Sequence, residues 1–128
     1  MRKPDSAEGT TREAVKTFKA TEPLLAAMLE ELRKFASKKP EAAVSKQKIA
    51  IVNRLLTDLK ALLAGAPNIK YLDLLTEDDL PQYSDVVLIL SQYEAAMKAF
   101  RVRYRKWELN QHVWLLQGGE KMKDDDVD

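Results

Sequence analysis

The chain has 128 residues, of which 45% are hydrophobic and 32% are charged, and this suits one globular domain with a hydrophobic core. Only four glycines argue against an all-β fold with its many turns, and the absence of cysteine excludes disulfides and thiolate chemistry. The net charge of +1 combines an acidic end from Gly118 onward with a mildly basic remainder, less basic than a dedicated nucleic-acid binder.

The two ends of the chain carry no structural period. Residues 1–9 and 118–128 are polar, the latter acidic, and we expect both to be disordered tails around a single domain at residues 10–117. The opening letters MRKPDSAEGTT lack the apolar core of a signal peptide, and no apolar run approaches the ~20 residues of a membrane span. These features predict a cytoplasmic protein without membrane contact.

A first helix is predicted after the capping-box pattern Thr10-Thr11-Arg12-Glu13, in which a threonine side chain and Glu13 each satisfy a free amide of the first turn. Pro23 lies within this segment, and because the helical period continues across it, we expect a kink or two short helices in line. The residues of one helical face then follow at steps of four and three: Ala14, Phe18, Thr21, Leu25, Met28, Leu32 and Phe35.

A second helix is predicted to begin with Pro40 at its first position and to end at Gly65, which Pro67 follows. Its apolar face contains Ile49, Val52, Leu56, Leu59 and Leu63. The link that follows should contain a short connecting helix around Ile69 to Leu75.

A third, long helix is predicted between Pro81 and Gly118, because no proline or glycine interrupts about 34 residues, ~50 Å of helix. A 3.5-residue repeat of mainly apolar and aromatic residues runs along it and predicts coiled-coil-like packing. We call this row the aromatic seam: Val86, Leu90, Tyr93, Met97, Phe100, Tyr104, Trp107, Gln111 and Trp114. The local alternation of polar and apolar residues at Arg101–Arg105 would suit a strand, but the longer helical pattern outweighs it.

The predicted fold is therefore all-α, an antiparallel bundle of three long helices plus one short connecting helix. A second apolar row lies about 170° from the seam on the long helix, formed by Leu88, Ala95, Val102, Leu109 and Leu116. Because a helix that is apolar on two opposite sides must be covered on both, we expect a protein partner or a second copy to dock there. The expected contact residues are Leu88, Val102, Leu109 and Leu116, with Arg101, Arg103 and Arg105 orienting the partner electrostatically.

The function predicted from this surface is a non-catalytic interaction or assembly module, a small subunit or an adaptor. The alternative is a protein that acts on nucleic acid. RNA readers combine basic grooves with exposed aromatic side chains. Here Tyr104 and Trp107 fall on the aromatic seam and are expected in the core, so nucleic-acid binding is not favoured.

Arg105 and His112, the only histidine, are separated by six residues. This spacing resembles the R-x(4–6)-H element of HEPN-type ribonucleases, small all-helical proteins that often act as dimers. The resemblance implies metal-independent RNA cleavage with His112 as the acid–base group and Arg105 against the phosphate. The family usually has asparagine or aspartate directly after the arginine, and this chain has Lys106.

The sequence predicts neither a metal site nor a cofactor. His112 has no second histidine or cysteine beside it, as a zinc site would need. The acids Glu77, Asp78, Asp79 and Asp85 lack the spacing of a calcium loop and suit helix N-termini. Without a G-x-S-x-G turn or a glycine-rich phosphate loop, we expect no enzymatic activity outside the Arg105–His112 alternative.

Overall fold

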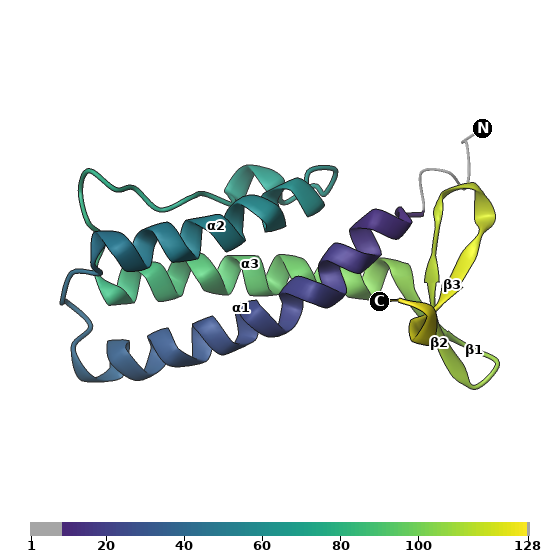
Figure 1. Cartoon of the computed structure of the whole chain (residues 1–128), viewed down its shortest axis with the longest axis horizontal. Coiled ribbons are helices and arrows are strands. Elements are labelled where there is room, and N and C mark those ends of the chain that lie inside the picture. Colours follow the sequence, from purple (N-terminus) through teal and green to yellow (C-terminus); the bar gives the residue numbers. More distant parts are fainter. Residues whose placement is uncertain (1–8, 128) are drawn as a thin grey trace.

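Three α-helices lie side by side, and a small antiparallel sheet stands at one end of them (Figure 1). The structure is a computed structural model that describes residues 9–127, so all of the predicted N-terminal tail except Gly9 lies outside the described residues. The helices are α1 (Arg12–Lys38), α2 (Lys46–Leu62) and α3 (Tyr83–Tyr104). The strands are β1 (Arg105–Glu108), β2 (Gln111–Leu115) and β3 (Lys121–Lys123). Of the short 3-10 helices, η2 (Ile69–Tyr71) lies between α2 and α3, η3 (Gln117–Gly119) joins β2 to β3, and η4 (Asp124–Asp126) follows β3.

Helix α1 begins one residue later than the predicted capping box. The N-cap is Thr11, whose side-chain oxygen accepts a hydrogen bond from the Ala14 amide at 3.1 Å. Thr10 instead pairs with Leu116 beside the sheet, so its backbone hydrogen bonds are made with the C-terminal part of the chain. Pro23 lies inside α1, which is assigned as one helix from Arg12 to Lys38.

Helix α2 begins six residues after Pro40, with Ser45 as its N-cap. The segment before it forms a turn and a single bridge between Ala43 and Gln82, and its backbone binds the start of α3. The carbonyls of Pro40 and Ala42 accept from the amides of Ser84 and Tyr83, each at 3.0 Å. The prediction that the second helix begins at Pro40 is wrong. The hydrogen bonds to the start of α3 stabilise this segment more than an extra turn of helix at Pro40 would.

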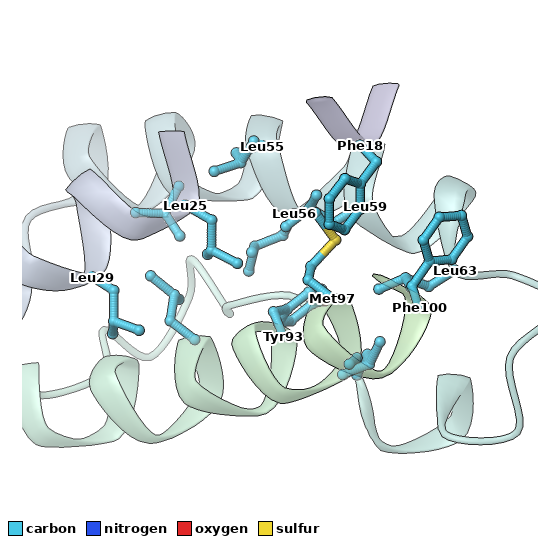
Figure 2. Packing of buried hydrophobic residues seen from close by; sticks show 14 of the residues in the cluster. Phe18, Leu25, Leu29, Leu55, Leu56, Leu59, Leu63, Tyr93, Met97 and Phe100 are labelled. Atoms are coloured by element: carbon cyan, nitrogen blue, oxygen red, sulfur yellow. The ribbon is translucent and has the colours of Figure 1, made fainter. Parts of the chain in front are cut away.

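The core lies between the three helices, and Figure 2 shows side chains from all three converging in it. Every residue of the predicted α2 face is at most 3% exposed, which confirms that face. On α3 the aromatic seam is buried as far as Phe100. Each fully buried leucine or phenylalanine side chain contributes roughly 1.5–3 kcal/mol, so these faces account for the arrangement of the helices.

The predicted all-α fold is wrong, because the chain leaves the helix at Tyr104 and forms a three-stranded antiparallel sheet in the order β1-β2-β3. The fold is therefore α+β, and the coiled-coil-like repeat ends with α3. The turn between β1 and β2 consists of Leu109 and Asn110, both with positive φ (49° and 64°). This is the left-handed pair that tight two-residue hairpins need.

The length of α1 gives the physical reason for this ending. Phe18 of α1 stacks on Phe100 of α3 with ring centroids 5.5 Å apart. Beyond Phe18, α1 continues only to Arg12, ~9 Å, whereas a helix extended from Phe100 to Gln117 would project ~25 Å. Its last turns would have no helix to pack on. By folding back, the chain brings Trp114 onto Phe18 at 5.3 Å, where Trp114 is completely buried.

The acidic C-terminal segment, predicted as a disordered tail from Gly118, contributes β3 and η4 instead. The turn into it uses Gly118 and Gly119 at φ of 80° and 83°, a conformation that costs glycine little. In β3, Met122 pairs with Trp114 and is 3% exposed. One buried side chain and the strand pairing therefore hold a segment whose composition alone suggested disorder.

Candidate docking surface

The predicted contact row is only partly preserved. Leu88 and Val102 lie on α3 and are 63% and 61% exposed, so this part of the row faces away from the core. Leu109, predicted on the long helix, lies instead at the tip of the β1–β2 hairpin, where it is 91% exposed. Leu116 is 5% exposed, and its amide donates to the Glu120 carbonyl at 2.8 Å. Leu116 therefore belongs to the core, because the sheet turns it inward.

The three predicted arginines differ in how far their charges are already neutralised. Arg101 forms an ion pair with Glu22 of α1. Arg105 donates to Asp124 at 2.9 Å. Arg103 is exposed and forms no ion pair with any residue in the 9–127 range. Among these three side chains, Arg103 is the one whose charge is free to meet a partner.

The first hairpin has one face rich in aromatic and basic groups. Arg105 pairs with Trp114 across the two strands, and Trp107 pairs with His112. Because side chains alternate along a strand, these four residues share one face. Trp114 closes the inner end of that face, whereas Trp107 is 62% exposed and meets the His112 ring edge-on at 4.7 Å. The aromatic seam thus divides, with Trp114 in the core and Trp107 at the surface.

Leu109 combines two unfavourable features. A leucine in the left-handed region costs roughly 1–2 kcal/mol, and turns of this type normally place asparagine, aspartate or glycine there. Its side chain is 91% exposed and so recovers no burial energy within the described chain. Backbone strain of this kind is often kept at binding sites. We call the exposed residues at this end, Val102, Arg103, Trp107 and Leu109, the hairpin surface.

Sequence reasoning placed Trp107 in the core and missed the turn at Leu109. Two signals could have found the hairpin: the alternation that starts at Arg101 and continues into β1, and Asn110, a residue that adopts positive φ at little cost. Both were outweighed by the longer helical period, which matches the true helix only as far as Tyr104.

The structure places Arg105 and His112 on neighbouring strands, not two turns apart on a helix. Arg105 pairs with Trp114, and His112 lies two residues before Trp114, diagonally across from Arg105. The guanidinium nitrogen Arg105 Nε and the ring nitrogen His112 Nδ1 are both buried without a hydrogen-bond partner. The guanidinium of Arg105 lies 6.0 Å from the Trp114 ring and binds Asp124. The helical setting on which the ribonuclease resemblance rested is therefore absent.

Asp124 fixes this end of the sheet. Its carboxylate accepts hydrogen bonds from Trp114 Nε1 at 2.8 Å, Arg105 Nη2 at 2.9 Å and Lys19 Nζ at 3.3 Å. Partial burial by itself raises the pKa of Asp124. The three hydrogen bonds and the positive charge of Arg105 outweigh that effect, so the pKa lies below the usual aspartate value. Asp124 thus ties β1, β2 and α1 together through one charge.

Within residues 9–127, no three histidine, aspartate or glutamate side chains lie close enough together to hold a metal ion. Among the helices of that range, none is long and apolar enough to cross a membrane. Comparison of the chain with protein-family models, with curated proteins and with solved structures finds no match. The case for function therefore depends on the hairpin surface and its chemistry.

Proposed function

We propose that this protein is a non-catalytic interaction module, a small subunit or adaptor, that docks a protein partner through the hairpin surface. The observation that carries the proposal is Leu109, which is 91% exposed and held at positive φ beside the exposed Trp107. A chain that keeps a strained leucine at a hairpin tip gains nothing in its own stability. Insertion of Leu109 into a partner would recover the lost burial energy.

The neighbouring residues indicate what the partner offers. Tryptophan and arginine are enriched at the energetic centres of protein interfaces. Trp107 lies in β1 close to the hairpin tip, and Arg103 lies in the last turn of α3 at the base of the hairpin. Lys106 is also exposed and adds positive charge on the other face of β1, where its amine donates to the Val102 carbonyl at 3.2 Å. A partner with an apolar pocket for Leu109 and Trp107, bordered by carboxylates that meet Arg103 and Lys106, would complement this surface.

The test is affinity capture from the source cells with the wild-type chain and with Leu109→Asn, with nuclease added in one arm. Asparagine tolerates the left-handed backbone, so the substitution should raise stability by about 1 kcal/mol, roughly 4 °C in Tm. The same substitution should lower capture of the partner by about tenfold or more. Because the variant is more stable, loss of capture cannot be attributed to unfolding.

Leu74→Asn is the matched control, since Leu74 is 41% exposed in the linker before α3 and lies outside the hairpin surface. It should leave capture unchanged. Equal capture by the wild type and by both Leu109→Asn and Trp107→Ala would contradict the proposal.

Nucleic-acid binding is the second candidate, because the exposure of Trp107 removes one of the two reasons for disfavouring it, the expected burial of its ring. The exposed Trp107 can stack on a base, while Arg103 and Lys106 at the same end of the molecule offer cations for phosphates. Retention of RNA that falls steeply with salt, together with loss of the captured material in the nuclease arm, would support this candidate over a protein partner. Loss of RNA cleavage in His112→Ala would in turn separate a nuclease from a binder.

A further inference from the structure

A groove with a volume of about 630 Å³ lies between α1 and α2, and no residue of α3 lines it. Its floor and walls are largely apolar, and three large side chains in it remain accessible: Leu24 is 57% exposed, Ile51 48% and Phe35 47%. Three such residues gathered on one face form an apolar patch of the kind that marks an interface. This groove is separate from the hairpin surface, whose residues do not line it.

Four charged residues also line the groove, Glu31 on α1 and Lys48, Arg54 and Asp58 on α2. Among the residues that the structure describes, few groups neutralise these charges. Glu31 meets only the exposed Lys34, at 3.7 Å, and Lys48 donates to the Tyr83 hydroxyl at 2.9 Å. Arg54 and Asp58 form no side-chain hydrogen bond or ion pair with another residue of the 9–127 range.

The order of these charges along the groove can be derived from the helix geometry. Lys48 Nζ lies 4.6 Å from the centroid of the Phe35 ring, so these residues mark a common level on α1 and α2. The two helices are antiparallel (Figure 1). At a rise of 1.5 Å per residue, Glu31 then lies ~6 Å along the groove, Arg54 ~9 Å and Asp58 ~15 Å. The charges alternate as plus, minus, plus, minus.

This order is symmetric about its midpoint, ~7.5 Å from Lys48. When the groove is turned end to end by a twofold axis across the helices, Lys48 falls opposite Asp58 of the other copy. Glu31 of one copy then lies at the level of Arg54 of the other, across the groove from it. The apolar residues follow the same rule. Phe35 and Leu24 lie ~16 Å apart at opposite ends of one groove, so Phe35 of one copy faces Leu24 of the other. A surface that complements its own reversed image is what an isologous dimer requires. A different partner protein would place no such constraint on this chain.

We propose that a second copy of this chain occupies the groove, so that α1 and α2 of each copy pack antiparallel against those of the other. Each dimer then contains two contacts between Lys48 and Asp58 and a central group of Glu31 and Arg54 side chains. The patch is small, which places the dimer among weak, concentration-dependent associations.

Sedimentation of the full chain across a micromolar to millimolar concentration range tests the proposal, with circular dichroism to confirm the fold of each variant. The wild type should dimerise. Asp58→Lys sets two lysines against each other at both contacts and should weaken the dimer by about tenfold or more. The double variant Lys48→Glu with Asp58→Lys restores opposite charges and should regain most of the lost affinity.

Asp78→Lys is the matched control, because it makes the same charge change at an exposed position in the linker. Leu109→Asn should also leave the dimer unchanged, which separates this proposal from the proposed docking function. A chain that remains monomeric throughout the range would overturn the proposal. Equal weakening by Asp58→Lys and Asp78→Lys, or no recovery in the double variant, would do the same.

Discussion

Asp124 offers the sharpest test of how the C-terminal segment is held. Asp124→Asn keeps the size of the side chain but removes its negative charge. In the wild type this carboxylate accepts from Trp114, Arg105 and Lys19, and its side chain is only 22% exposed. Asparagine has one acceptor oxygen, so it cannot serve all three donors, and Arg105, itself 24% exposed, loses its counter-charge.

The expected loss follows from these contacts. A hydrogen bond to a charged group contributes roughly 1.5–3 kcal/mol, and a surface ion pair such as that of Lys19 adds little. Replacement of the carboxylate should therefore cost about 2 kcal/mol. With an unfolding entropy of roughly 2.1 cal/mol/K per residue over this chain, that corresponds to a Tm lowered by roughly 7 °C.

Thermal unfolding monitored by tryptophan fluorescence measures this effect, since Trp114 is a donor to Asp124. Asp125→Asn is the control, because Asp125 is the exposed neighbour and carries the same charge.

The pKa of Asp124 is lowered in the folded state. The stability it provides is thus complete above the unfolded value near 3.9 and is lost as the pH falls through the lower folded value. The gap between wild type and Asp124→Asn should narrow below about pH 4. Equal Tm values for Asp124→Asn and Asp125→Asn at neutral pH would refute the role given to the Asp124 carboxylate.

Two further predictions concern the linker before α3. The side chain of Asn53 donates to the Leu75 carbonyl and accepts from the Leu75 amide, each at 2.8 Å, so Asn53→Ala should cost about 2 kcal/mol and speed hydrogen exchange at the Leu75 amide. An unchanged rate of hydrogen exchange at the Leu75 amide in Asn53→Ala would contradict this prediction. Burial, together with the charge of Asp73, raises the pKa of Tyr93 to about 12. An ultraviolet titration should therefore show a tyrosine step well above the ordinary value near 10. Because the folded state favours the neutral phenol, stability should fall as the pH rises from about 10 toward 12, and Tyr93→Phe should abolish the late tyrosine step.

The helical faces could be predicted from the sequence because each depends on local periodicity. The positions Ile49, Val52 and Leu56 repeat at helical steps and are buried as expected. The seam from Val86 to Phe100 follows the same rule. In these segments the period that favours a helix also matches the face that the neighbouring helices cover, so local and tertiary preferences agree.

The candidate sites were harder to predict. Val102 and Arg103, predicted as contact residues, are exposed, whereas Trp107 was assigned to the core and Leu116 to the contact row. Both errors have one origin, since a single helix was assumed to continue through a turn. The α1–α2 groove was not anticipated at all, because it depends on the level at which Lys48 of one helix meets Phe35 of the other.

The sequence by itself determined the three helices, the buried face of α2, that of α3 as far as Phe100, and the mildly basic character of the region around Arg103. The tertiary structure alone decided where the last helix ends. The residues from Arg105 to Trp114 satisfy a helical period, but α1 stops ~9 Å beyond Phe18 and leaves no surface on which that helix could pack. A hairpin allows Trp114 to reach the core and carries Leu109 and Trp107 into solvent. Helix periodicity is a property of the segment, whereas its burial depends on how far the neighbouring helix extends.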